Sequence, residues 1–171
     1  MFSLVPRRKR YGSGTSKRGK IKNTKNIETR PAIIEKRSRV GDWESDTIEG
    51  AKGTGYVATH VCRKTKYVVL AKLRTKSAAT FNRCTIKAFK RHGELVSHTF
   101  TVDRGKEFAA HEQFEKKMKC TVYFAKPYHA WQRGTNENTN GLLRQYLPKG
   151  VDFGTISNKY LKHVEKFLNM F

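Results

Sequence analysis

Residues 41–74 read "GDWESDTIEGAKGTGYVATHVCRKTKYVVLAKLR" and contain three segments rich in β-branched and aromatic residues. The segments span residues 42–50, 55–63 and 66–74, and glycines and basic turn residues separate them. Short apolar runs bounded by turn residues are typical of strands that pair in succession. We therefore expect a three-stranded antiparallel meander at the start of the folded part of the chain.

Helices and strands alternate after the meander. Ser77 is a good N-cap for a helix that ends at Gly93, and residues 98–103 form the next predicted strand. A helix over about 107–119, a strand over 121–125 and two helices over 136–147 and 157–171 complete the order. This order predicts an α/β fold with a mixed five-stranded sheet flanked by helices.

The first 40 residues differ in composition from the rest. They carry 13 Lys or Arg and 2 Glu, which is half of the formal charge of +22, and they lack a helix or strand period. Such a segment buries too little apolar surface to offset its chain entropy. We expect residues 1–40 to be a basic, largely flexible linker or DNA-binding arm, with order beginning near Arg30 and the folded core spanning 41–171.

The charge indicates the class of partner. A net charge of +22 and a pI of about 10.2 attract polyanions, and nucleic acid is the leading expectation. No apolar run approaches the roughly 20 residues of a membrane span, and the N-terminal apolar run is too short for a signal peptide. We expect no membrane partner and an intracellular location.

The cysteines carry little functional signal. Cys62, Cys84 and Cys120 are odd in number and widely spaced, which indicates neither a disulfide framework nor a redox pair. His60 and Cys62 could serve as two zinc ligands, but no second close pair completes a four-ligand site, so we do not expect zinc.

Three acidic residues are candidates for a site, although each could also be a surface charge. Asp46 lies within the first strand of the meander, and Asp103 ends the predicted strand over 98–103. Glu137 lies near the start of a helix that Thr135 or Asn136 would cap. The alternative for Glu137 is a favourable contact with the helix dipole, worth about 0.3 to 1 kcal/mol. That alternative leaves the neighbouring polar residues unexplained.

The helix that carries Glu137 has a polar face and an apolar face. The polar face holds Glu137, Asn140, Gly141 and Arg144, at the spacing i, i+3, i+4 and i+7. A glycine in mid-helix costs about 1 kcal/mol relative to alanine. The position of Gly141 therefore suggests that a bulky partner approaches this face closely.

Three motifs occur in a fixed order: "GDWESDTIEG" at 41–50, "TVDRGKEF" at 101–108 and "PYHAWQRGTNENTNGLLRQYLPKG" at 127–150. From about Arg30 to Phe171 the chain resembles the catalytic core of a DDE transposase of the IS-thirty insertion-sequence group, a relative of retroviral integrases. The 33 residues between Asp103 and Glu137 match the spacing of that group, and so does the basic Arg144. The resemblance implies a ribonuclease H-like fold.

The same resemblance implies a function. Asp46, Asp103 and Glu137 would be catalytic and would bind Mg²⁺ or Mn²⁺, with two ions. A transposase of this kind cleaves DNA at element ends and transfers the free 3′-OH into target DNA, as a homo-oligomer in the bacterial cytoplasm at the nucleoid. Glu44 shares a strand face with Asp46 and could support that residue, and Glu107 is expected to cap a helix, so neither is expected as a ligand.

Basic and aromatic residues surround the third motif. They suit contacts with phosphates and exposed bases. We expect DNA contacts from Lys126, His129, Trp131, Arg133, Asn140, Arg144 and Lys149.

Two other functions stay open. No helix-turn-helix is legible in residues 1–40, and the chain ends where similar proteins continue. The protein could therefore be a truncated, non-catalytic DNA-binding or regulatory form of a transposase. A nuclease of the same fold would use the same acids but would lack strand joining.

Overall fold

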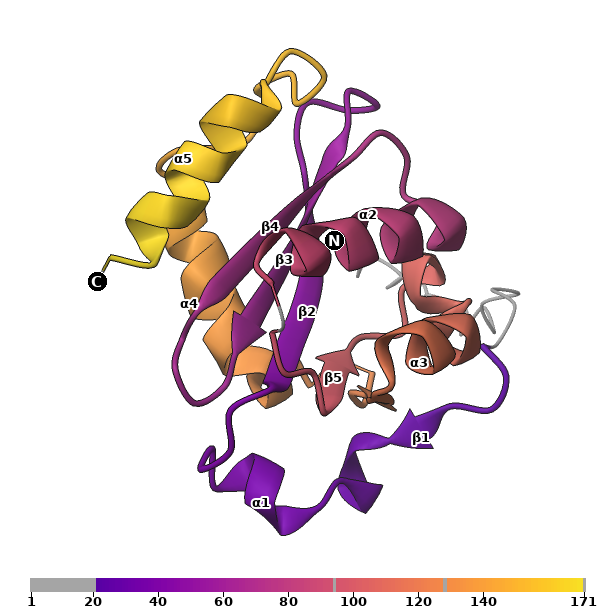
Figure 1. The fold of residues 1–171 in the computed structure, drawn as a ribbon. Helices are drawn as coiled ribbons and strands as arrows, with labels where there is room; N and C mark the ends of the chain where they lie inside the picture. The colour runs from indigo at the N-terminus through magenta and orange to yellow at the C-terminus, as the bar shows by residue number, and fades with distance from the viewer. Residues whose placement is uncertain (1–20, 94, 128, 171) are drawn as a thin grey trace, which may run out of the picture.

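Six strands form one mixed sheet in the computed structural model, which describes residues 21–93, 95–127 and 129–170, apart from the side chains of residues 130 and 131 (Figure 1). The strand order is β1-β6-β5-β2-β3-β4. Strands β2, β3 and β4 are antiparallel neighbours, whereas β5 pairs in parallel with β2 and β6. The strands are β1 (Lys25–Asn26), β2 (Asp42–Glu49), β3 (Tyr56–Cys62), β4 (Val68–Leu73), β5 (Thr99–Val102) and β6 (Thr121–Phe124).

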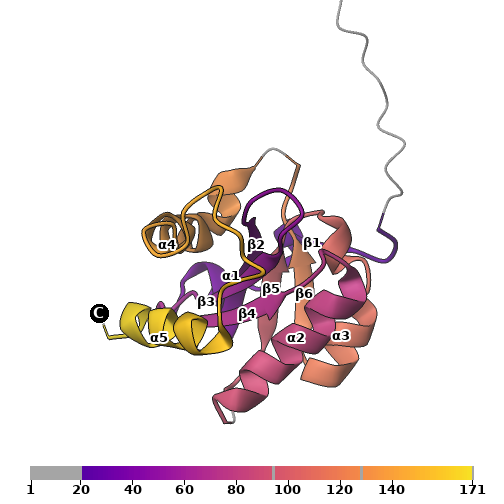
Figure 2. The ribbon, with the colours of Figure 1, turned by 90° about the horizontal axis from the view of Figure 1, so that it is seen from above.

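Helices cover both faces of this sheet. Helices α2 and α3 lie on one face and α4 and α5 on the other (Figure 2). The α-helices are α1 (Ala32–Glu35), α2 (Ala78–Arg91), α3 (His111–Met118), α4 (Gly134–Leu143) and α5 (Asn158–Leu168); the 3-10 turns are η1 (Ile27–Thr29), η2 (Lys106–Phe108) and η3 (Ala130–Arg133). Within the described ranges, no helix is long and apolar enough to cross a membrane.

Alternation along the strands divides the core into two layers. Val69 and Ala71 of β4 pack in the cluster under α2 and α3, whereas Val68 and Leu70 pack in the cluster under α4 and α5. Successive strand side chains point to opposite faces, so a sheet covered on both sides is apolar at nearly every position. The predicted meander and the α/β class are confirmed.

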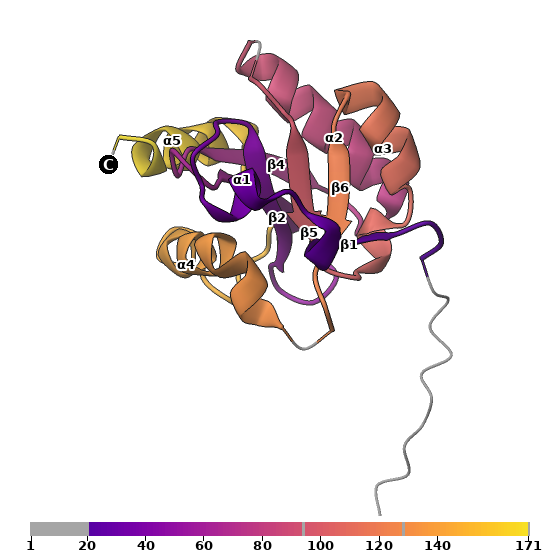
Figure 3. The same cartoon turned by 90° about the horizontal axis from the view of Figure 1, so that it is seen from below.

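The N-terminal part of the fold differs from the expectation. Within the predicted arm, β1 pairs in parallel with β6, so the sheet has six strands and not five (Figure 3). Ile27 and Ile34 are buried, and Ile34 is fully so. Two isolated isoleucines and a strand of two residues are too short to produce a recognisable period. Residues 1–20, the rest of the predicted arm, lie outside the described residues.

Two helix boundaries also differ from the expectation. The helix predicted over about 107–119 is divided into η2 and α3. Helix α4 begins at Gly134, so Thr135 and Asn136 are buried helical residues and not N-caps. Arg133 occupies the N-cap position and forms no capping hydrogen bond with its side chain. The first amide groups of α4 therefore need another acceptor.

Helix α5 covers the free edge of β4. The side-chain amide of Asn169 donates to the carbonyl of Val68 and accepts its N–H, at 2.9 and 2.7 Å. The carboxylate of Glu165 accepts the N–H of Leu70 and pairs with Arg91. These contacts satisfy backbone groups that an edge strand would otherwise present to another chain.

Candidate active site

Asp46 lies on β2, and Asp103 directly follows β5, the parallel neighbour of β2. The register of β2 and β5 pairs Trp43 with Phe100 and Glu44 with Thr101. Two further residues along each chain lead to Asp46 and Asp103, which therefore lie level with each other. Side chains two residues apart share a strand face, so Asp46 points to the same face as Glu44, toward α4.

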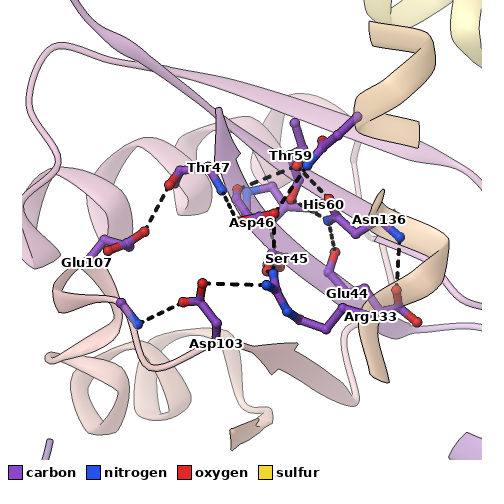
Figure 4. Close-up of polar contacts among 12 residues, drawn as sticks. Glu44, Ser45, Asp46, Thr47, Thr59, His60, Asp103, Glu107, Arg133 and Asn136 are labelled. Atoms are coloured by element: carbon purple, nitrogen blue, oxygen red, sulfur yellow. Dashed lines mark hydrogen bonds and ion pairs between the residues drawn. The ribbon is translucent and has the colours of Figure 1, made fainter. Parts of the chain in front are cut away.

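The guanidinium of Arg133 bridges these two acids (Figure 4). Its Nη1 lies 3.4 Å from Asp46 Oδ2, and its Nη2 lies 3.5 Å from Asp103 Oδ2. Arg133 also donates to the carbonyl of Ser45 at 3.3 Å, and its Nε is buried without a hydrogen-bond partner among the described residues. A cation thus lies between two carboxylates just beyond the last paired residues of β2 and β5.

The environments of the two acids differ. Burial raises the pKa of Asp46, and the charge of Asp103 adds to that rise, whereas Arg133 and the N–H of Thr47 oppose it. Asp103 is more exposed, and its Oδ1 accepts the N–H of Gly105 at 2.7 Å. Two carboxylates close together in a partly buried place repel each other, so a cation beside them stabilises the ionised pair.

Glu137 is on the nearby helix α4, but its side chain is exposed. It lies four residues after Arg133 and three before Asn140, and the side chains of both these residues contact Asp46. Residues at this spacing share a helix face, so Glu137 belongs to the face turned toward the acids. Among the described residues, no three His, Cys, Asp or Glu side chains form a group that could hold a metal ion. The convergence of Glu137 with the two aspartates stays a prediction.

Asn140 and Arg144 connect the same face of α4 to β2. Asn140 Nδ2 donates to Asp46 Oδ2 at 3.2 Å, and its Oδ1 is buried with no hydrogen-bond partner in the described part of the chain. Arg144 donates to the carbonyl of Glu49 at 3.0 Å. Both residues were expected to contact DNA, and both lie beside the candidate site.

The other predicted DNA contacts lie before and within η3 and after α4. Lys126 pairs with Glu28, and its N–H donates to Gln132 at 2.9 Å. His129 Nδ1 lies 2.7 Å from the carbonyl of Pro127. Lys149 is exposed in the turn after α4. The side chain of Trp131 lies outside the described residues.

Two glutamates that were not expected to be metal ligands make buried contacts near the site. Glu44 is fully buried and accepts the N–H of Asn136, the residue before Glu137. Glu107 does not cap a helix: its carboxylate accepts a hydrogen bond from Thr47 at 2.9 Å and pairs with Lys76. The sequence itself places Glu44 on the same strand face as Asp46, because the two residues are two positions apart in one strand.

The side chains around Asp46 carry the donor types that a hard divalent cation prefers. Asp46 and Asp103 already hold a positive group between their oxygens, and Asn140, whose Oδ1 has no partner among the described residues, contacts Asp46 through its Nδ2. Carboxylate and amide oxygens without sulfur or imidazole suit Mg²⁺ and Mn²⁺. Glu137 could add a third carboxylate from the same helix face.

Solved structures share this fold. A chain of the simian T-cell lymphotropic virus intasome in complex with the PP2A regulatory subunit B56 gamma aligns with a TM-score of 0.58 at 18% identity, over 72% of this chain and 46% of that one. The catalytic core domain of BIV integrase aligns with a TM-score of 0.53 at 19% identity, over 76% and 79%. The fold is that of a retroviral integrase catalytic core, which is ribonuclease H-like.

Sequence comparison assigns the family. Residues 37–130 match the Integrase core domain model, and the chain belongs to that family. The match includes Asp46 and Asp103 and ends before Glu137. The chain is 45% identical to the transposase for insertion sequence element IS4351 of Bacteroides fragilis over 92% of its length, and 38% identical to transposase InsI for IS30A of Escherichia coli (strain K12) over 94%. It covers 48% and 43% of those relatives, or about half of their length.

Proposed function

We propose that this chain is the catalytic core of a DDE-type transposase, which cleaves DNA at element ends and joins the resulting 3′-OH to target DNA. The observation that carries the proposal is the pair Asp46 and Asp103, level on adjacent parallel strands beside the helix that contains Glu137. The similarity to insertion-sequence transposases supports the reaction class.

The three acids have a common task in this proposal. Asp46, Asp103 and Glu137 would hold two Mg²⁺ or Mn²⁺ ions, which when bound supply Lewis-acid activation of the attacking oxygen and stabilise the leaving oxygen. Asp46 must be ionised for this task, and Arg133 stabilises its charged form. Asn140, which donates to Asp46, holds that carboxylate in one orientation.

Both reactions are displacements at phosphorus. In the first, water forms a bond to the phosphorus at the element end, and the 3′ oxygen of the element leaves and takes up a proton. In the second, that 3′-OH loses its proton as its oxygen bonds to a target phosphorus, and the 3′ oxygen of the target strand leaves and takes up a proton. No covalent bond to the protein is needed, so the protein's contribution is positioning and electrostatic stabilisation.

DNA is the proposed partner. Lys126 and His129 precede η3, and Arg144 and Lys149 follow α4; we propose that these four residues contact phosphates. A joining reaction brings two element ends together, and the intasome among the structural neighbours is an assembly, so we propose that the active form is a homo-oligomer. Such a protein would act in the bacterial cytoplasm at the nucleoid.

Conversion of supercoiled plasmid to nicked or joined products, with Mn²⁺ or Mg²⁺, tests this function. Wild type should show metal-dependent activity, whereas Asp46→Asn, Asp103→Asn and Glu137→Gln should lose at least 100-fold, on the order of the loss when a charged transition-state contact is removed. Glu137 is exposed, so its substitution should leave stability unchanged. Glu112→Gln, an exposed acid on α3, is the matched control and should stay active.

The alternatives give different results. A precleaved donor with a free 3′-OH should be joined to plasmid, whereas a nuclease of this fold would nick plasmid without joining. Tight DNA binding without any product would indicate a non-catalytic DNA-binding form. Equal activity in wild type and all acid variants would contradict the proposed site.

A further inference from the structure

We propose that Glu44 is a positioning residue that fixes the start of α4 and thereby places Glu137; this inference rests on the proposed function. Glu44 Oε2 accepts the backbone N–H of Asn136 at 2.9 Å (Figure 4). Asn136 is the third residue of α4 and directly precedes Glu137.

The first turn of α4 lacks a local cap. The first four N–H groups of a helix have no partner within it, and Ser, Thr, Asp or Asn at the N-cap normally accepts one of them. Arg133 stands at the N-cap and has no acceptor in its side chain. Glu44 on β2 supplies the missing acceptor, and its negative charge also favours the positive end of the helix dipole.

The side chain of Asn136 forms three further hydrogen bonds between the start of α4 and the sheet. Its Nδ2 donates to the carbonyls of Glu44 and Thr59, at 2.9 and 3.1 Å, and its Oδ1 accepts from Thr59 Oγ1 at 3.0 Å. Asn136 is therefore bound to both β2 and β3 and is fully buried. Glu137 follows it by one residue, so the attachment of Asn136 limits where Glu137 can lie.

A buried carboxylate needs compensation, and Arg63 provides it. Arg63 Nη1 lies 2.5 Å from Glu44 Oε1, and neither side chain is appreciably exposed. Arg63 Nε donates to the carbonyl of Ile34 at 3.1 Å, and Nη2 pairs with Glu35 at 3.3 Å. The N-terminal segment that contains α1 therefore completes the network that holds the start of α4.

Two double variants separate the capping role from the burial of charge. Glu44→Gln with Arg63→Met removes both charges and keeps an oxygen acceptor at position 44. Glu44→Met with Arg63→Met removes the same charges and keeps a similar side-chain volume, but has no oxygen acceptor. The two proteins differ in the side-chain amide at position 44, whose oxygen can accept the N–H of Asn136.

Hydrogen exchange of residues 134–140 is the primary measurement, made on variants whose circular dichroism shows a folded protein. The double variant with Glu44→Met should exchange at least tenfold faster there than the double variant with Glu44→Gln, because a buried donor loses its acceptor. Exchange in α5 should be equal in the two. Equal protection of residues 134–140 in both folded variants would overturn the proposal.

A matched control is available on the other helix of this face. Glu165 is also a buried carboxylate that accepts a strand N–H and pairs with an arginine, Arg91. It lies on α5 and connects that helix, not α4, to the sheet. Glu165→Met, which removes the acceptor for the N–H of Leu70, should increase exchange in residues 158–168 more than in 134–140. If Glu165→Met and the double variant Glu44→Met with Arg63→Met change both helices alike, Glu44 has no specific role at α4.

Functional readouts distinguish this inference from the proposed function. The double variant without the acceptor should bind Mn²⁺ more weakly and have a lower kcat for plasmid nicking, with KM for DNA unchanged. The double variant with glutamine should regain most of both. If wild type neither binds Mn²⁺ nor nicks DNA, the proposed function fails, and the exchange data still decide whether Glu44 holds α4.

Discussion

Arg133 Nη1 lies 3.4 Å from Asp46 Oδ2, so a residue expected to contact DNA is paired with a predicted catalytic acid. The same guanidinium reaches Asp103 at 3.5 Å. Arg133 thus has the position and charge of a substitute for a metal ion. When metal binds, this pairing would have to open, and Arg133 would then be available for a DNA phosphate.

Removing the guanidinium should strengthen metal binding. In Arg133→Gln, no positive charge offsets the repulsion between Asp46 and Asp103. A divalent ion then no longer has to displace the guanidinium of Arg133. We expect the affinity for Mn²⁺ to rise roughly tenfold, equivalent to about 1.4 kcal/mol, while the free energy of unfolding without metal falls. Isothermal titration calorimetry measures the affinity. Arg104→Gln, near the same strand end but paired with Asn26, should bind Mn²⁺ like wild type; weaker binding in Arg133→Gln would contradict the substitution role.

At Gly141, the effect of a substitution on stability can be measured separately from its effect on DNA cleavage. An added Cβ would meet nothing within 4 Å, so the fold itself does not need glycine there. Gly141→Ala should raise the free energy of unfolding by about 0.5 to 1 kcal/mol, because alanine favours the helix. If DNA approaches this face closely, the same change should lower plasmid cleavage several-fold.

Urea denaturation and plasmid nicking measure the two effects of Gly141→Ala. Gly134→Ala, in the first turn of the same helix and also without a neighbour at the added Cβ, is the control and should keep its cleavage activity. Full cleavage activity in a stabilised Gly141→Ala protein would show that no partner requires this glycine.

His60 should make stability depend on pH. Its ring is completely buried between Ser45 and Thr85, and burial lowers its pKa from 6.5 to about 3. Below pH 6.5 the unfolded chain binds a proton that the folded chain does not, so stability falls as pH decreases from 6.5 toward 3. Between pH 6.5 and 5 this group should remove about 1.5 kcal/mol.

Urea denaturation at pH 6.5 and 5 tests the role of His60. Between pH 6.5 and 5, the free energy of unfolding of His60→Gln should fall by about 1.5 kcal/mol less than that of wild type, whatever the variant's absolute stability. His163→Gln, which replaces an exposed histidine on α5, should keep the wild-type pH dependence. The same pH dependence in wild type and His60→Gln would refute this assignment.

Asn169 satisfies the backbone N–H and carbonyl of Val68 at the edge of β4. Asn169→Ala removes two hydrogen bonds to Val68 and should cost about 1 to 3 kcal/mol. The exposed edge should also promote association between chains, which sedimentation velocity at several concentrations detects. Asn158→Ala, an exposed residue at the start of α5, is the control. Unchanged stability and sedimentation in Asn169→Ala would show that α5 does not protect this edge.

Most of the helices and strands were predictable because their signals are local. Ser77 and Ser157 cap α2 and α5 by accepting the N–H three residues later, and the alternation along β4 is visible in the sequence. The start of α4 was not predictable in the same way. Its cap is Glu44, which precedes Asn136 by 92 residues, so no nearby residue indicates it.

The sequence by itself determined the class of fold, the candidate acids and the family resemblance, because periodicity, caps and motifs depend on neighbouring residues. Only the tertiary structure decided that Asp46 is level with Asp103, that Arg133 lies between them, and that Glu44 accepts the N–H of Asn136. It also showed that β1 and α1 belong to the folded unit. These relationships depend on strand register and on compensation of buried charge between distant segments, which form only when the whole sheet packs.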